Sequence, residues 1–183
     1  MKKLLAIVSA AVISLLAVGC SLSRVSAKDT LDKTLTAIIA LDQEVFTDEL
    51  GNSQLSSEGL SAADAARLEL TKAVFSNSGY VINDATENDD SAALNVTVTA
   101  PDFTSLMNTF SADYSDKIVS GEIDISSVSK ESFTLAMYET VINAVKEKNC
   151  DFISTDITIN ITYAEGEWSI DNVGELTNAF LNF

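Results

Sequence analysis

The chain has 183 residues, and its 27 acidic residues outnumber its 11 lysines and arginines, giving a formal net charge of −16 at pH 7. This charge repels phosphate backbones and anionic headgroups, so we expect no nucleic-acid binding. Histidine is absent, which excludes Ser-His-Asp and Cys-His catalysis, His-ligated zinc and histidine pH switching.

The first 20 residues are arranged like a secretory signal. Lys2 and Lys3 form a short positive region, and residues 4–18 are almost entirely apolar. This apolar stretch of about 15 residues is shorter than the ~20 needed to cross a bilayer. It ends at Gly19 and Cys20, where a small residue lets a peptidase approach and a thiolate can accept a lipid. An ordinary cleaved secretory signal is the alternative interpretation.

The four residues from Ala17 to Cys20, AVGC, resemble the lipobox of bacterial lipoproteins. The resemblance implies diacylglyceryl transfer to Cys20, cleavage before it and, often, acylation of the new terminus. It departs from the family at Ala17, where leucine is commonest. We therefore expect a lipoprotein signal peptide over residues 1–19, a lipidated tether over 20–28 and a single domain over 29–183. Two acyl chains would anchor the protein stably outside the cytoplasm, on the cell membrane or on an outer membrane where one exists.

Two helices are predicted after the tether. Apolar residues recur at helical spacing over residues 29–46, although Asp42 interrupts them, either as a functional carboxylate or because the helix reaches a less buried turn. A polar loop over residues 47–59 precedes an alanine-rich helix over 61–75, which Ser61 can cap.

Four strands are predicted as two pairs. Residues 79–84 form a short strand, an acidic loop over 85–90 follows, and residues 92–100 alternate between apolar and polar side chains. This alternation is typical of an antiparallel sheet with one face in water. Residues 152–164 alternate in the same way, and residues 167–171 return after a glycine turn as a hairpin.

Two further helices are predicted between the strand pairs. Asp102 caps the first of them, which ends near Gly121, and Ser129 caps the second, whose last turn contains Lys146. The residues from 174 onward form a short helix or docked tail. The whole order predicts an α+β domain in which a curved antiparallel sheet of about four strands packs against helices.

This order of elements resembles small, mostly uncharacterised lipoproteins of bacteria. The residues that carry the resemblance are YVI at 80–82, ALNVTVTAPD at 93–102 and ITINITYAEGEWSID at 157–171. The resemblance implies a cystatin-like or nuclear-transport-factor-2-like fold, in which a curved sheet wraps a helix. That fold contains enzymes and binding modules alike, so it implies no function. The catalytic residues of its enzyme members have no matching motif here.

Three aromatic residues, Tyr80, Tyr163 and Trp168, are candidates for a ligand pocket on the concave face of the sheet, and side chains of the core are the alternative. Residues 83–90 contain enough oxygen ligands for calcium, but a glycine turn is missing, which favours a solvated loop. Cys150 has no histidine to activate it, so a core role is favoured over a reactive thiol. No catalytic residue, metal or cofactor is predicted.

We therefore expect a membrane-anchored extracytoplasmic lipoprotein that acts as a non-catalytic binding or interaction module. The alternative is a small-ligand carrier or a carboxylate-based enzyme that uses the concave face of the sheet. The expected partners are the membrane, through the lipid on Cys20, and an envelope protein or small ligand whose identity the sequence does not specify.

Overall fold

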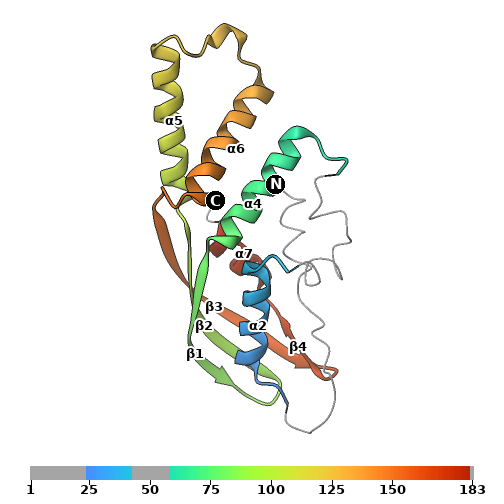
Figure 1. Cartoon of the computed structure of the whole chain (residues 1–183). Coiled ribbons are helices and arrows are strands. Elements are labelled where there is room, and N and C mark those ends of the chain that lie inside the picture. Colours follow the sequence, from blue (N-terminus) through green and yellow to red (C-terminus); the bar gives the residue numbers. More distant parts are fainter. Residues whose placement is uncertain (1–23, 43–57, 182–183) are drawn as a thin grey trace.

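A four-stranded antiparallel sheet in the order β1-β2-β3-β4 forms the centre of the computed structural model, which describes residues 24–42 and 58–181 (Figure 1). The strands are β1 (Gly79–Glu87), β2 (Ser91–Pro101), β3 (Phe152–Ala164) and β4 (Glu167–Ile170). The described helices are α2 (Ala27–Ile39), α4 (Ala62–Ser76), α5 (Phe103–Val119), the 3-10 turn η1 (Ile125–Ser127), α6 (Lys130–Lys146) and α7 (Val173–Leu181). The sheet is open, and the predicted α+β class with an antiparallel sheet is confirmed.

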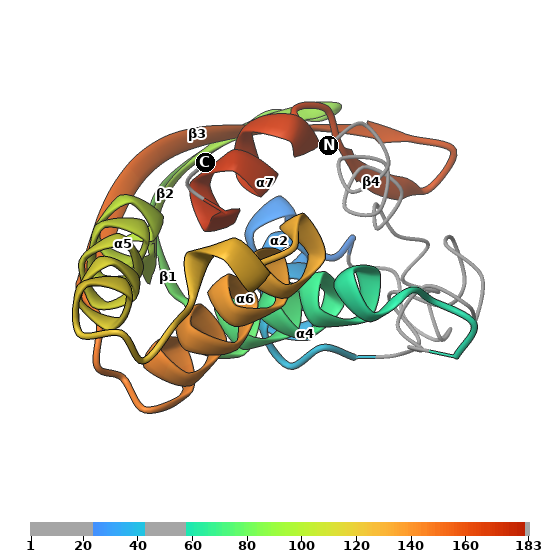
Figure 2. The same cartoon turned by 90° about the horizontal axis from the view of Figure 1, so that it is seen from above.

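The core lies between one face of the sheet and the helices that cover it. On β2 and β3 the side chains of Leu94, Val96, Val98 and Ile159 are completely buried, as the alternation of these strands predicts. Figure 2 shows the sheet curving around α7, whose Phe180 ring lies 5.4 Å from the Phe75 ring of α4. Helix α2 adds its own buried apolar residues to the same cluster, namely Ala27, Leu31, Leu35 and Ile38.

The two ends of the sheet have different connections. The β1–β2 and β3–β4 turns lie at one end, where α2 begins (Figure 1). At the opposite end β2 leads into α5 and α6 leads into β3, so that α5, η1 and α6 stand out from the sheet. We call residues 111–133 the arm tip. None of them is buried, although the Phe133 ring packs 5.4 Å from Phe110 and 5.0 Å from Tyr114.

Two predicted boundaries differ from the structure for local reasons. Helix α2 begins at Ala27 because the hydroxyl of Ser26 accepts a hydrogen bond from the Asp29 N–H at 3.0 Å. The helix ends at Ile39, and Leu41 adopts the left-handed conformation with φ of 54°. The prediction that the helix continues to residue 46 is therefore wrong for residues 40–42. Residues 43–57 lie outside the described part. Strand β1 extends to Glu87, and the predicted 85–90 loop shortens accordingly.

Candidate functional site

At the turn end of the sheet, the side chain of Arg24, four residues after Cys20, lies over the faces of two neighbouring aromatic rings. Its guanidinium carbon is 4.0 Å from the centre of the Tyr163 ring and 4.1 Å from that of Trp168. The two rings pack edge to face, with their centres 5.1 Å apart. A guanidinium within about 6 Å of an aromatic face is attracted by the negative face of the ring.

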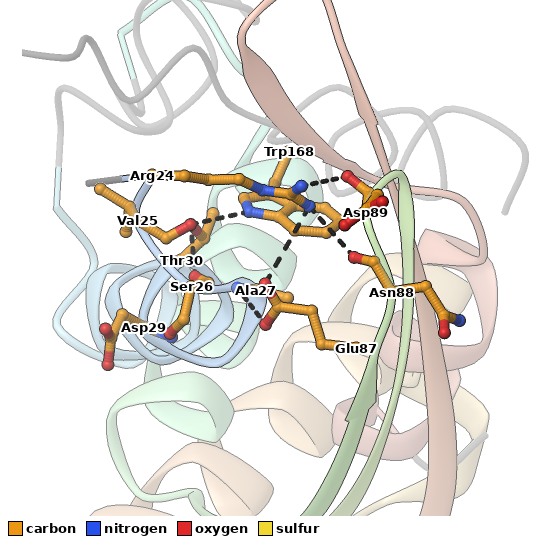
Figure 3. Close-up of polar contacts among 10 residues, drawn as sticks. All are labelled: Arg24, Val25, Ser26, Ala27, Asp29, Thr30, Glu87, Asn88, Asp89 and Trp168. Carbon is orange, nitrogen blue, oxygen red and sulfur yellow. Dashed lines mark hydrogen bonds and ion pairs between the residues drawn. The ribbon is translucent and has the colours of Figure 1, made fainter. Parts of the chain in front are cut away.

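The β1–β2 turn supplies oxygen acceptors to the same guanidinium (Figure 3). Arg24 Nη1 donates to the carbonyl of Asp89, and Nη2 donates to that of Asn88 at 3.5 Å. The carboxylate of Glu87 lies 4.0 Å from Nη2. About 29% of the Arg24 side chain remains exposed, so solvent screens its ion pair with Glu87.

A β-bulge in β1 brings Glu87 to this site. Tyr80 and Ile82 pair with buried residues of β2, but the register then shifts between Ile82 and Asp84, so Glu87 pairs with Ala92. Because side chains alternate between faces, the extra residue moves Glu87 onto the helix-covered face. There its Oε2 accepts the N–H of Ala27 at 2.9 Å. A carboxylate at this first turn is stabilised by the helix macrodipole.

Trp168 fixes the neighbouring backbone. Its indole N–H donates to the carbonyl of Val25 at 2.9 Å, and its side chain is only 5% exposed. The segment Arg24–Ala27 is therefore bound to both hairpins at once. We call Arg24, Glu87, Tyr163 and Trp168, with their backbone partners, the N-terminal clamp. Residues 24–28, which the sequence assigns to a tether, are docked on the sheet or form the start of α2.

The three candidate pocket residues do not come together. Tyr163 and Trp168 face each other across β3 and β4, and the chain's own Arg24 lies against them. Tyr80 is level with Thr155 of β3, eight positions from Tyr163, or roughly 26 Å along the strand. The expectation that all three line one pocket is therefore corrected.

Tyr80 holds α2 against the edge of the sheet. Its hydroxyl donates to Asp32 Oδ1 at 2.8 Å and lies 2.8 Å from the Thr36 hydroxyl, which can donate to it. Burial raises the pKa of Tyr80 above its usual 10.0, and the Asp32 carboxylate raises it further. The hydroxyl therefore stays protonated at neutral pH and serves as a structural donor.

The remaining candidates have different outcomes. Cys20 lies outside the described residues. Cys150 is partly buried, and its pKa is raised by burial and by the Asp151 carboxylate, which lowers its reactivity. Of residues 83–90, considered above as calcium ligands, Asn83 lies in β1, where its side-chain amide donates to the Thr97 hydroxyl at 2.9 Å. Across the described ranges, no group of three acidic or cysteine side chains is arranged to hold a metal ion.

Sequence reasoning missed Arg24 and Glu87, the two charged members of the N-terminal clamp. Glu87 has no sequence signal, because no glycine or proline marks the bulge that moves it onto the helix-covered face. A weak signal exists for Arg24, because it is the first cation after Cys20 and is followed closely by Ser26, which can cap a helix. The clamp binds a cation through aromatic faces and carbonyl oxygens, and that cation is part of the same chain.

Within the part of the chain that the structure describes, no helix has the length and apolar character required to cross a bilayer. The chain matches no family model and no curated protein. Among solved structures it is similar to ycdA from Bacillus subtilis subsp. subtilis str. 168, named a "putative lipoprotein", with a TM-score of 0.50 and 16% sequence identity. The match covers 85% of this chain and 47% of that one, so the chain spans about half the length of this neighbour.

At this identity the likeness shows the fold alone. It supports a fold like that of the Bacillus protein and gives no support to the cystatin-like or nuclear-transport-factor-2-like family that the order of elements resembles.

Proposed function

We propose that the chain is a lipid-anchored lipoprotein of the bacterial envelope, and that its domain is a non-catalytic interaction module held close to the membrane in one orientation. The lipid is carried by Cys20, after removal of residues 1–19. The observation that carries the proposal is the N-terminal clamp, which docks the segment that follows the anchoring residue.

The clamp limits how far the domain can move from its anchor. Four residue steps separate Cys20 from Arg24, and a fully extended chain covers at most about 14 Å in four steps. Arg24 is bound by the β1–β2 turn and by Tyr163 and Trp168, which flank the β3–β4 turn. The turn end of the sheet therefore faces the membrane, and the arm tip points away from it (Figure 1).

Three independent features support anchoring at Cys20. The positive region, the short apolar stretch and the Gly-Cys pair agree with a lipoprotein signal peptide. The structural neighbour is itself named a lipoprotein. The N-terminal clamp agrees with anchoring, because it holds the segment that follows Cys20 against the domain.

The alternative of a small-ligand carrier or carboxylate-based enzyme ranks second, because α2 and α7 pack into the helix-covered face of the sheet. Leu35 of α2, Phe180 of α7 and Leu94 of β2 are all completely buried there. Among the described residues of this face, the buried side chains fill the space that a ligand would need.

The test compares two cysteine variants of the full chain expressed in bacteria. Cys20→Ser should release the protein from washed membranes and leave its N-terminus unacylated by mass spectrometry. Cys150→Ser is the matched control, because it also loses a thiol. It should remain membrane-bound and acylated, since Cys20 is intact. Membrane retention of Cys20→Ser, or a native N-terminus other than acylated Cys20, would overturn the proposal.

A further inference from the structure

Exposed apolar side chains gather at the arm tip. Among the described residues, Val119 and Ile125 are the two most exposed large apolar side chains, at 87% and 66%. Phe133, 39% exposed, lies on the first turn of α6 in the same stretch. Isolated surface apolar residues are ordinary, but here two strongly exposed side chains lie six positions apart around one turn, beside a partly exposed phenylalanine.

The charges around these side chains are mainly negative. The arm tip contains five carboxylates, namely Asp113, Asp116, Glu122, Asp124 and Glu131, and two cations, Lys117 and Lys130. One of the cations, Lys117, is paired with Asp113 at 2.8 Å. Hydrogen bonds from Ser126 lower the pKa of Asp124, so this carboxylate is ionised at neutral pH. The surface therefore combines exposed apolar groups with unneutralised carboxylates.

The position of the arm tip agrees with contact away from the membrane. Strand β2 has 11 residues, about 36 Å, and leads from the clamped end to the base of α5. Helix α5 adds 17 residues, about 25 Å. With the anchor at the opposite end, the arm tip is presented far from the bilayer. Its negative charge also disfavours anionic lipids and a second copy of the same acidic surface.

We propose that the arm tip docks a basic, partly apolar surface of another envelope protein, with Val119 and Ile125 as the apolar contacts and Asp116 and Glu122 as the charged ones. This inference rests on the proposed function for its setting, since anchoring directs the arm tip outward. Charge complementarity favours a partner surface with positive charge, and burial of the Val119 and Ile125 side chains provides the affinity.

The test places a photo-crosslinking amino acid at Ser120 of the full chain in cells and maps the segment that it captures. The expected result is one protein adduct whose captured segment contains lysines or arginines beside apolar residues. The double variant V119D/I125D should reduce the adduct about tenfold or more, because it removes both apolar contacts and puts two charges where the partner's apolar groups would lie. Asp116→Lys and Glu122→Lys should each reduce it as well.

The control is Val81→Asp, which makes the same kind of change once, at a 59% exposed apolar position on β1 at the edge of the sheet. It should leave the adduct unchanged. Unchanged circular dichroism and thermal unfolding of V119D/I125D would exclude misfolding as the cause of a loss. The absence of an adduct would overturn the inference, as would an acidic captured segment, a lipid adduct, a self-adduct or an equal loss in Val81→Asp. Failure of the lipid anchor would instead appear in the Cys20→Ser fractionation, so the two outcomes are distinguishable.

Discussion

The N-terminal clamp and the arm tip are held in opposite ways. The clamp joins residues far apart in sequence: Arg24 reaches a carbonyl 65 positions away, and Trp168 reaches one 143 positions away. At the arm tip, side-chain hydrogen bonds join residues at most four apart, as in Ser115 to Ser111 and Ser132 to Ser129. Long-range contacts open only with the whole domain, whereas local contacts open one at a time. We therefore expect a rigid end and a more adaptable end, in which the Phe133 ring provides the longer-range contact between α5 and α6.

The largest expected effect comes from removing the centre of the rigid end. Trp168→Ala deletes a ring that is only 5% exposed, together with its hydrogen bond to Val25, and should lower the free energy of unfolding by about 3–5 kcal/mol. Urea denaturation measures the change. Trp168→Phe is the matched control: it retains most of the ring and loses the N–H donor, so it should cost much less. Equal losses in the two variants would show that the ring itself contributes little.

At the adaptable end, Phe133→Ala should cost about 2 kcal/mol, less than a fully buried phenylalanine, because this ring is 39% exposed. The reason is the loss of its contacts with the Phe110 and Tyr114 rings. Hydrogen exchange should quicken in residues 111–133 and stay unchanged in β2 and β3. Faster exchange throughout the sheet would contradict the separation of the two ends.

Replacing the cation of the clamp should have a smaller effect on stability and a clear spectroscopic one. Arg24→Ala should cost about 1 kcal/mol, the usual strength of a partly exposed cation–π contact. Trp168 is the single tryptophan of the chain, so its fluorescence reports on the site directly, and its emission should shift to the red as water reaches the ring. Arg24→Lys should restore this only in part, because an ammonium group lacks the planar guanidinium. An unshifted spectrum for Arg24→Ala would contradict the stacking.

The smallest expected effect is a pH dependence confined to the arm tip. Hydrogen bonds from the hydroxyl and N–H of Ser126 lower the pKa of Asp124 below 3.8. A lowered folded-state pKa means that the contribution to stability is present above the unfolded value and is lost as the pH falls through the folded value. An NMR titration of the carboxyl carbon should give a midpoint below 3.8, and Ser126→Ala should raise it. A midpoint at or above 3.8 in the native chain would be contrary to this expectation.

The sheet could be predicted from sequence because each strand shows its own alternation of apolar and polar residues. Alternation in residues 92–100 and 152–164 places Leu94 and Ile159 on the buried face, and the glycine turn at Gly166, with φ of 95°, closes the last hairpin. The first strand was predicted to end at residue 84, three residues before its actual end at Glu87. The alternation could not be followed further, because the bulge breaks the period of two between Ile82 and Asp84.

The clamp could not be predicted for a related reason. Its partners are brought together by the register of the whole sheet. The residues next to Arg24 in the sequence therefore do not indicate which distant residues surround it. Tyr163 and Trp168 were predicted, with Tyr80, to line a pocket on the concave face, whereas the group that lies against them is a side chain of the same molecule. Tyr80 was placed with them because aromatic residues on strands resemble one another in sequence, whereas strand register separates them.

The bulge in β1 also affects how molecules meet one another. As an outermost strand of an open sheet, β1 offers backbone groups with which a foreign strand could pair. The inserted residue interrupts the regular spacing of those groups, and Asp84 adds a carboxylate at the same point. Molecules crowded together at high concentration would thus meet a kinked, charged border, which opposes the strand-by-strand stacking that starts aggregation.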